Sequence, residues 1–147
     1  MSVVNYSRKI QDLRLGEKGE CEVLKRLIEK FGEGVKKYQG TYSLKDFYLT
    51  NKKGDVIQEW ELKTRRVTKD KYPTTAFGLN KYEHSLKALP NCKQTYLFNF
   101  TDGLCYWDLY NPQLQKDEFE FGEIANRRRG GKPHTAVFVH KEHLKSF

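Results

Sequence analysis

Apolar residues recur with a helical period early in the chain. The positions that share this 3.6-residue stripe are Val23, Leu24, Leu27, Ile28 and Phe31. Such a stripe predicts an amphipathic helix with one face on a core, and Gly32 and Gly34 are expected to end it. A second amphipathic helix is predicted before Pro90 from Leu79, Tyr82, Leu86 and Leu89.

Between these helices, two apolar runs around a polar turn predict a β-hairpin. The runs are Phe47 to Leu49 and Val56 to Leu62, and the turn includes Gly54, whose freedom to adopt positive φ suits a tight connection. Side chains alternate between the two faces of a strand, so Trp60 and Leu62 are expected to point into a core. The residues predicted on the opposite face are Glu59, Glu61 and Lys63.

Further strands are predicted at residues 35–38, 95–100, 104–109 and 135–140. The order of helix, strand pair, helix and strand pair suits an α/β sandwich, in which a central mixed β-sheet is flanked by helices. With 147 residues, of which 37% are hydrophobic, the chain is long enough for one core and too short for two ordinary domains. We therefore expect a single domain over residues 1–147.

The acids of the hairpin suit a metal-dependent phosphodiesterase. Asp46 opens the first strand at the end away from the turn, and Glu61 and Lys63 lie at the matching end of the second strand. Two adjacent carboxylates form the hard oxygen site that Mg²⁺ or Mn²⁺ takes. An acid-x-lysine tripeptide alone is common, and charges at alternate positions also occur on ordinary solvent-facing strands. The context of the hairpin therefore carries the prediction.

In the order of its acidic residues and the lysine, the chain resembles the PD-(D/E)XK nuclease superfamily, in which an acid on a helix precedes a hairpin that carries an Asp and then Glu-x-Lys. The matching residues are Glu20 in GEKGECEVLKRLIEKFG, Asp46 in KDFYL and Glu61-Leu62-Lys63 in QEWELKTRR. The resemblance covers roughly residues 16 to 100. Lys45 stands where the nominal pattern of the family has proline.

The resemblance implies a restriction-endonuclease-like core and a Mg²⁺-dependent endonuclease that hydrolyses phosphodiester bonds in DNA, with Mn²⁺ as the alternative ion. It implies that Asp46, Glu61 and the Leu62 carbonyl hold the metal. Lys63 would orient the attacking water or stabilise the charge that develops on the phosphate. Nicking, double-strand cleavage and cleavage of branched DNA all remain open.

Other acids compete for supporting roles in this site. Glu17 and Glu20 fall in the first helical turn, where the positive end of the helix dipole favours carboxylates without any catalytic role. The Gly-x-x-Gly-Glu spacing of the resembling family favours Glu20, which would assist through a second ion or its bound water, with Glu17 as the substitute. Glu59 is the reserve ligand if the hairpin register slips.

Charge favours a nucleic-acid partner. The formal net charge is +8, from 27 basic and 19 acidic residues, which suits a polyanion such as DNA. The basic residues predicted to contact it are Arg65, Arg66, Lys69, Lys71, Arg127, Arg128, Arg129 and Lys132. For residues 126–132, a solvated loop is an equal alternative. Tyr72 lies in the segment 68–75, which we expect to form a groove wall.

Cysteine usage and hydropathy indicate an intracellular protein, in the cytoplasm or in a host cell. Cys21, Cys92 and Cys105 have no short spacing, which argues against a disulfide framework and a zinc knuckle. They are expected to be reduced and buried. Neither a membrane span nor the apolar region of a signal peptide is recognisable.

Two competing chemistries have weaker support. His134, His140 and His143 cluster near the C-terminus, and His140-x-x-His143 suits a metal chelate if helical, although a surface pair is the simpler interpretation. No glycine-rich phosphate loop or Gly-x-Ser-x-Gly elbow is present, which disfavours nucleotide kinases and serine hydrolases.

Two further functions remain open beside a DNA endonuclease. One is a non-catalytic nucleic-acid-binding module that uses basic residues and exposed aromatics such as Tyr72 or Tyr106. The other is a nuclease of the same fold that acts on RNA, since recognition of the sugar hydroxyl depends on loop geometry. A chain of this size has room for one active site, so double-strand cutting or junction cleavage would require a homodimer.

Overall fold

The computed structural model describes residues 19–39, 43, 45–125 and 132–147, and its centre is a six-stranded mixed β-sheet. In spatial order the strands are β1 (Val35–Lys37), β2 (Phe47–Thr50), β3 (Val56–Thr64), β5 (Lys93–Phe100), β6 (Gly103–Leu109) and β9 (Lys145–Ser146). Strands β3 and β5 are parallel, and the other neighbours are antiparallel. The predicted α/β class with a mixed sheet is confirmed.

The predicted hairpin is formed by β2 and β3, and its turn is fully exposed. Gly54 adopts a φ of 89° there, in the region that glycine favours. Asn51 Oδ1 accepts hydrogen bonds from the backbone N–H groups of Lys53 and Asp55, which close the turn. The turn therefore fixes which residues of the two strands face each other.

The connection from β3 to its parallel neighbour β5 builds a second layer. It contains a 3₁₀ turn η1 (Lys69–Lys71), strand β4 (Thr74–Gly78) and helix α2 (Leu79–Ala88). Strand β4 pairs with β8 (His134–His140), and β8 pairs with β7 (Phe119–Ile124). The second layer therefore consists of a three-stranded sheet and α2. A second 3₁₀ turn, η2 (Lys141–His143), leads from β8 to β9.

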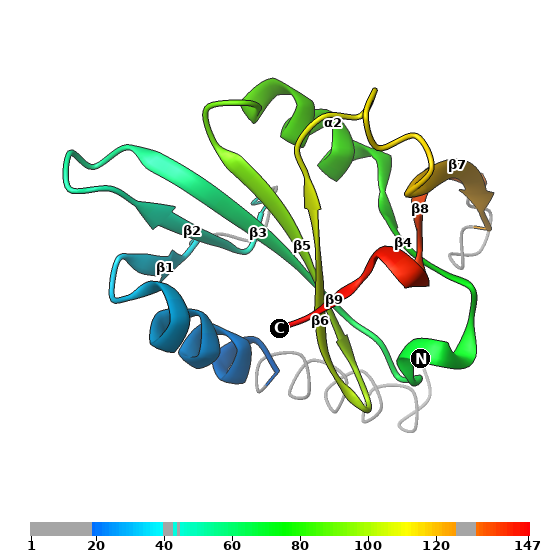
Figure 1. Cartoon of the computed structure of the whole chain (residues 1–147), viewed down its shortest axis with the longest axis horizontal. Coiled ribbons are helices and arrows are strands. Elements are labelled where there is room, and N and C mark those ends of the chain that lie inside the picture. Colours follow the sequence, from blue (N-terminus) through cyan, green and yellow to red (C-terminus); the bar gives the residue numbers. More distant parts are fainter. Residues whose placement is uncertain (1–18, 40–42, 44, 126–131) are drawn as a thin grey trace, which may run out of the picture.

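The central sheet is covered on both faces (Figure 1). The helix over residues 19–31 packs on one face, where its stripe meets side chains of β3 and β5 such as Trp60 and Leu97. Helix α2 and the three-stranded sheet cover the other face, where Tyr96 and Trp107 lie in the second core. Strand β3 therefore has both of its faces buried over its central residues, and this forces charged side chains into the interior.

Several predictions of the sequence need correction. Residues 74 and 75 begin β4, and strands β4, β7 and β9 were not predicted. Cys21 is exposed, whereas Cys92 and Cys105 are buried as expected, and all three thiols are free. The exposure of Cys21 follows from its place on the helix face opposite Val23 and Leu27, which are buried.

Candidate active site

The hairpin places Asp46 beside the segment that carries Glu61. Asp46 directly precedes β2, and its backbone N–H donates to the Trp60 carbonyl at 2.9 Å. Its side chain turns back toward β3, so that Asp46 Oδ2 accepts a hydrogen bond of 2.7 Å from the Leu62 N–H. The first acid of the predicted motif is thus bonded to the residue between Glu61 and Lys63.

Glu61 lies between two lysines that come from different elements. Lys63 Nζ, from the same strand, is 3.5 Å from Glu61 Oε1, and Lys81 Nζ, from α2, is 3.6 Å from Glu61 Oε2. Glu61 is only 3% exposed. Its Oε2 atom is buried, and within the described part of the chain no hydrogen-bond donor reaches it. This carboxylate oxygen is therefore held near positive charge without a close partner.

Burial disfavours the ionised form of both acids, and a neighbouring carboxylate adds to this effect for each of them. Burial raises the pKa of Glu61, the nearby Asp46 carboxylate raises it further, and Lys63 and Lys81 act in the opposite direction. Burial also raises the pKa of Asp46, although the Leu62 N–H opposes this change. Two carboxylates whose charges cost free energy are suited to bind a cation that removes the cost.

Glu20 lies near this pair but has a partner of its own. Its Oε2 atom is 2.6 Å from Lys37 Nζ of β1. The Glu20 carboxylate also contributes to the raised pKa of Asp46, so its charge acts on the site. A supporting role for Glu20 fits this placement, while Glu17 lies outside the described residues.

The donor set fits a hard divalent cation. Asp46 and Glu61 supply carboxylate oxygens, and the buried Glu61 Oε2 has no donor among the described residues. The N–H and C=O of a strand residue face the same neighbouring strand, so we expect the Leu62 carbonyl to face the side where Asp46 lies. No three His, Cys, Asp or Glu side chains of the described residues are placed to hold an ion together. Mg²⁺ does not require such a cage, because one or two carboxylates and water suffice.

Glu59 points to the same face as Glu61 but is engaged elsewhere. It accepts hydrogen bonds from Tyr38 Oη at 2.5 Å and from Gln94 Nε2 at 3.0 Å, and His84 Nε2 is 3.1 Å away. Burial acts to raise the pKa of Glu59, but these hydrogen bonds outweigh it and lower the pKa. Since its oxygens already accept hydrogen bonds, Glu59 has a structural role and is not available as a reserve metal ligand.

Lys45 is a buried cation next to the site, a placement that the sequence pattern does not predict. It is 1% exposed, its Nζ donates to Ser85 Oγ at 2.9 Å, and it lies 4.1 Å from the centre of the Tyr96 ring. Burial lowers the pKa of Lys45 to about 8, and the negative charges of Glu61 and Glu59 oppose that change. A lysine in the place of the nominal proline thus adds a positive charge beneath the two acids.

The basic residues predicted to meet nucleic acid have different environments. Arg65 is hydrogen-bonded to β4, since its guanidinium donates to Thr75 Oγ1 at 3.4 Å and to the Ala76 carbonyl. The side chains of Arg66, Lys71 and Lys132 are exposed, and Lys69 is half-buried in η1. Arg127, Arg128 and Arg129 lie outside the described residues.

The histidines near the C-terminus lie apart from the two acids. His140 Nε2 is 3.9 Å from a Glu120 oxygen, and His143 Nδ1 is 4.0 Å from a Glu118 oxygen. Each of the two histidines thus faces one carboxylate. His134, at the start of β8, is exposed.

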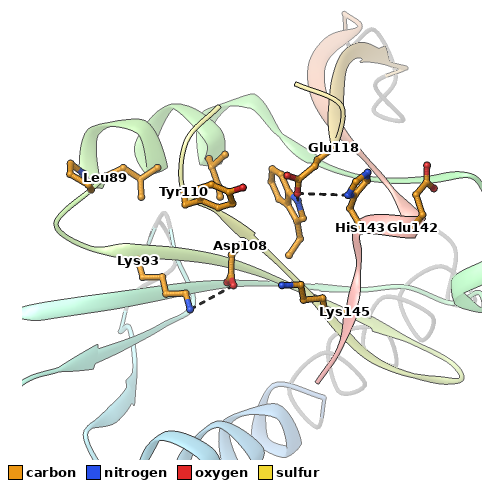
Figure 2. Close-up of a pocket in the computed structure, with 11 residues that line it drawn as sticks. Leu89, Lys93, Asp108, Tyr110, Glu118, Glu142, His143 and Lys145 are labelled. Atoms are coloured by element: carbon orange, nitrogen blue, oxygen red, sulfur yellow. Dashed lines mark hydrogen bonds and ion pairs between the residues drawn. The ribbon is translucent and has the colours of Figure 1, made fainter. Parts of the chain in front are cut away.

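Figure 2 shows a cavity of about 660 Å³ that is lined by other residues. Its lining includes Leu89, Lys93, Asp108, Glu118 and His143, and it contains neither Asp46 nor Glu61. Three of its charged side chains have partners within the protein: Lys93 Nζ is 3.6 Å from Asp108 Oδ2, and Glu118 Oε1 accepts the Trp107 indole N–H at 3.0 Å.

Comparisons with protein-family models, with curated proteins and with solved structures found no match to this chain. Among the described residues, no helix has the length and apolar character needed to cross a membrane. The interpretation of the site therefore rests on its residues and their geometry.

Proposed function

We propose that this protein is a Mg²⁺-dependent endodeoxyribonuclease with a restriction-endonuclease-like core. The observation that carries the proposal is the placement of Asp46 and Glu61 at one end of the hairpin, where each acid has a raised pKa and Lys63 lies 3.5 Å from Glu61. An ordinary solvent-facing strand does not fit this arrangement, since Glu61 is 3% exposed.

The residues divide the chemistry between them. Asp46, Glu61 and the Leu62 carbonyl would hold the ion. A divalent cation in this place supplies Lewis-acid activation of water and neutralises charge on the scissile phosphate. Lys63 would hold the attacking water or a phosphate oxygen, and its positive charge would stabilise the charge that develops there. Glu20 supports the site through its charge.

A basic protein suits a DNA substrate. The formal net charge of +8 draws a polyanion toward a site whose own acids would repel phosphate. Lys69 and Lys71 follow β3 closely in the chain, and Lys71 is exposed. Mg²⁺ is the expected ion, and Mn²⁺ is expected to substitute for it because both prefer oxygen ligands.

The test is incubation of the protein with supercoiled plasmid in Mg²⁺ or in EDTA, beside the Glu61→Ala variant. The proposal expects nicked or linear product that requires both the metal and Glu61. Retained secondary structure of the variant, measured by circular dichroism, is the control for folding. Cleavage that is unchanged by Glu61→Ala would overturn the assignment of the site.

The same experiment separates the alternatives. A non-catalytic binding module would retard DNA on a gel without Mg²⁺ and would leave the plasmid intact. An RNA-specific nuclease would leave the plasmid intact but cut a structured RNA in a reaction that depends on Mg²⁺ and Glu61.

A further inference from the structure

Lys81 reaches the proposed active site from an element that the hairpin motif does not include. It is in the first turn of α2, and its Nζ lies 3.6 Å from Glu61 Oε2. The same ammonium donates to the Ser43 carbonyl at 3.4 Å. Its side chain is 17% exposed, so it is partly accessible from solvent.

The position of Lys81 is fixed by buried contacts of its backbone. Tyr96 Oη donates to the Lys81 carbonyl at 3.1 Å and shares a hydrogen bond of 2.6 Å with Ser85 Oγ. Tyr96 is fully buried in the core beneath α2, and Tyr82 next to Lys81 is also buried. A functional group on such a rigid element keeps its geometry better than one on a loop.

The contact between Lys81 and Glu61 is an ion pair without a well-formed hydrogen bond. At 3.6 Å the two atoms are too far apart for a good hydrogen bond. Lys63 stands at 3.5 Å from the other carboxylate oxygen. Two ammonium groups from separate elements therefore face one buried carboxylate, and each retains hydrogen-bonding capacity for another acceptor.

The charges of the cluster favour a phosphate as that acceptor. Lys63 and Lys81 balance the two charges of Asp46 and Glu61, and the charge of Lys45 beside them is offset by that of Glu59. A divalent cation between the acids leaves a surplus of about two positive charges, which suits a phosphodiester and suits its more negative transition state better. The ammonium groups of Lys63 and Lys81 supply hydrogen-bond donors on either side of the Glu61 carboxylate.

We propose that Lys81 is a second phosphate-binding lysine, which contacts a non-bridging oxygen of the scissile phosphate from the side opposite to Lys63. This inference rests on the proposed nuclease function and adds a residue to the site. It assigns to α2 a direct part in catalysis, whereas the motif found in the sequence lies on the first helix and the hairpin.

The competing explanation is that Lys81 only neutralises Glu61, and a double-mutant cycle in DNA binding separates the two. Binding of a short fluorescent DNA duplex is measured by anisotropy in EDTA, first for Lys81→Met and then for Lys81→Met combined with Glu61→Gln. The matched control is Lys87→Met, since Lys87 is an exposed lysine in the last turn of the same helix. Each variant is compared with its own parent.

A phosphate contact requires that Lys81→Met weaken binding even when Glu61 is already neutral. We expect the dissociation constant to rise roughly threefold or more and the salt slope to fall by about 1 in the Glu61→Gln background. Lys87→Met should change neither. In single-turnover cleavage with Mg²⁺, Lys81→Met should lose about 10²- to 10³-fold in rate.

Failure of this inference differs from failure of the nuclease proposal. If wild-type protein cleaves plasmid but Lys81→Met binds and cleaves like Lys87→Met, the role of Lys81 is overturned and the nuclease stands. An effect of Lys81→Met that vanishes in the Glu61→Gln background also overturns it. If wild-type protein never cleaves but binding still depends on Lys81 in that background, the phosphate contact stands and the nuclease proposal falls.

Discussion

Asp46 Oδ2 accepts a hydrogen bond of 2.7 Å from the backbone N–H of Leu62. This bond joins the start of β2 to the part of β3 that lies between Glu61 and Lys63. A shift of one residue between the strands would move both Glu61 and Lys63 to the other face of the sheet. The aspartate therefore holds the register on which the candidate site depends.

Replacement of this aspartate by asparagine tests its charge apart from its hydrogen bond. In Asp46→Asn the amide oxygen can still accept the Leu62 N–H, but the negative charge that would bind the ion is gone. We expect cleavage in Mg²⁺ to fall at least about 10²-fold, with a melting temperature equal to or above that of the wild type, since burial raises the pKa of the carboxyl.

Asp46→Ala is the matched comparison, because it removes both features. It should be less stable than Asp46→Asn by about 1 kcal/mol, since the Leu62 N–H loses its acceptor. Urea denaturation of the two variants measures this difference. Wild-type cleavage rates in Asp46→Asn would exclude Asp46 as a metal ligand.

Much of the central sheet is predictable because its signals are local. The stripe of Val23 and Leu27, the turn at Gly54 and the inward position of Trp60 each depend on a few neighbouring residues, and all three appear in the structure. The alternation in Phe119-Glu120-Phe121 was an equally local signal for β7 and was missed.

The rest of the site depends on contacts between distant segments. Lys45 and Ser85 are 40 positions apart, and Lys81 meets Glu61 only because α2 packs on the core that contains Tyr96 of β5. Each lysine taken alone resembles an ordinary surface lysine in the sequence. The sequence also does not distinguish the structural role of Glu59 from the proposed metal-binding role of Glu61, because the difference comes from the distant donors Tyr38 and Gln94.

Neutralising Glu61 should make the fold more stable at neutral pH. Its folded-state pKa is raised, so the unfolded chain loses this proton at lower pH than the folded protein, and stability falls as pH rises through that interval. Glu61→Gln removes the cost, and we expect a gain on the order of 1 kcal/mol at pH 7.

The pH dependence identifies the cause of that gain. The advantage of Glu61→Gln should shrink as pH is lowered below the folded-state pKa, because the wild-type carboxyl is then also neutral. Urea denaturation between pH 4 and pH 7 measures it. A Glu61→Gln protein that is less stable at pH 7 would mean that the lysines stabilise the carboxylate more than burial penalises it.

Lys45 should reduce stability fully below about pH 8, and this cost should fall progressively as pH rises from about 8 to 10.5. Burial lowers its pKa to about 8, whereas the unfolded chain keeps the ordinary value of 10.5. Between these values the unfolded state binds more protons, so stability rises with pH. A full effect corresponds to roughly 3 kcal/mol.

The variant Lys45→Met lacks this titration and is the reference. The difference in unfolding free energy between the wild type and Lys45→Met should move in favour of the wild type from pH 7.5 to pH 10. The other lysines are shared by both proteins and cancel in the difference. A difference that is constant over this range would show that the buried ammonium is compensated by Glu61 and Glu59.

Glu59 should be needed for folding and not for the chemical step. Glu59→Ala leaves Tyr38, Gln94 and His84 without their shared buried acceptor, and we expect a loss of about 3 kcal/mol in unfolding free energy. Single-turnover cleavage at a temperature where the variant is folded should stay within about threefold of the wild type. Abolished cleavage by fully folded Glu59→Ala would restore Glu59 as a candidate ligand.

The lysines of η1 should bind DNA backbone, and the hairpin turn offers a control within the same protein. Lys69 and Lys71 follow β3 beyond the end that carries Glu61, whereas Lys52 and Lys53 lie at the exposed turn at the other end of that strand. If DNA lies across the candidate site, Lys69→Ala and Lys71→Ala should each lower the salt slope of binding by about 1. Lys52→Ala and Lys53→Ala carry the same change in net charge, and they should leave the slope unchanged. Equal effects of the two pairs, measured by anisotropy from 50 to 200 mM salt, would mean that net charge alone attracts the DNA and that no defined track leads to Asp46 and Glu61.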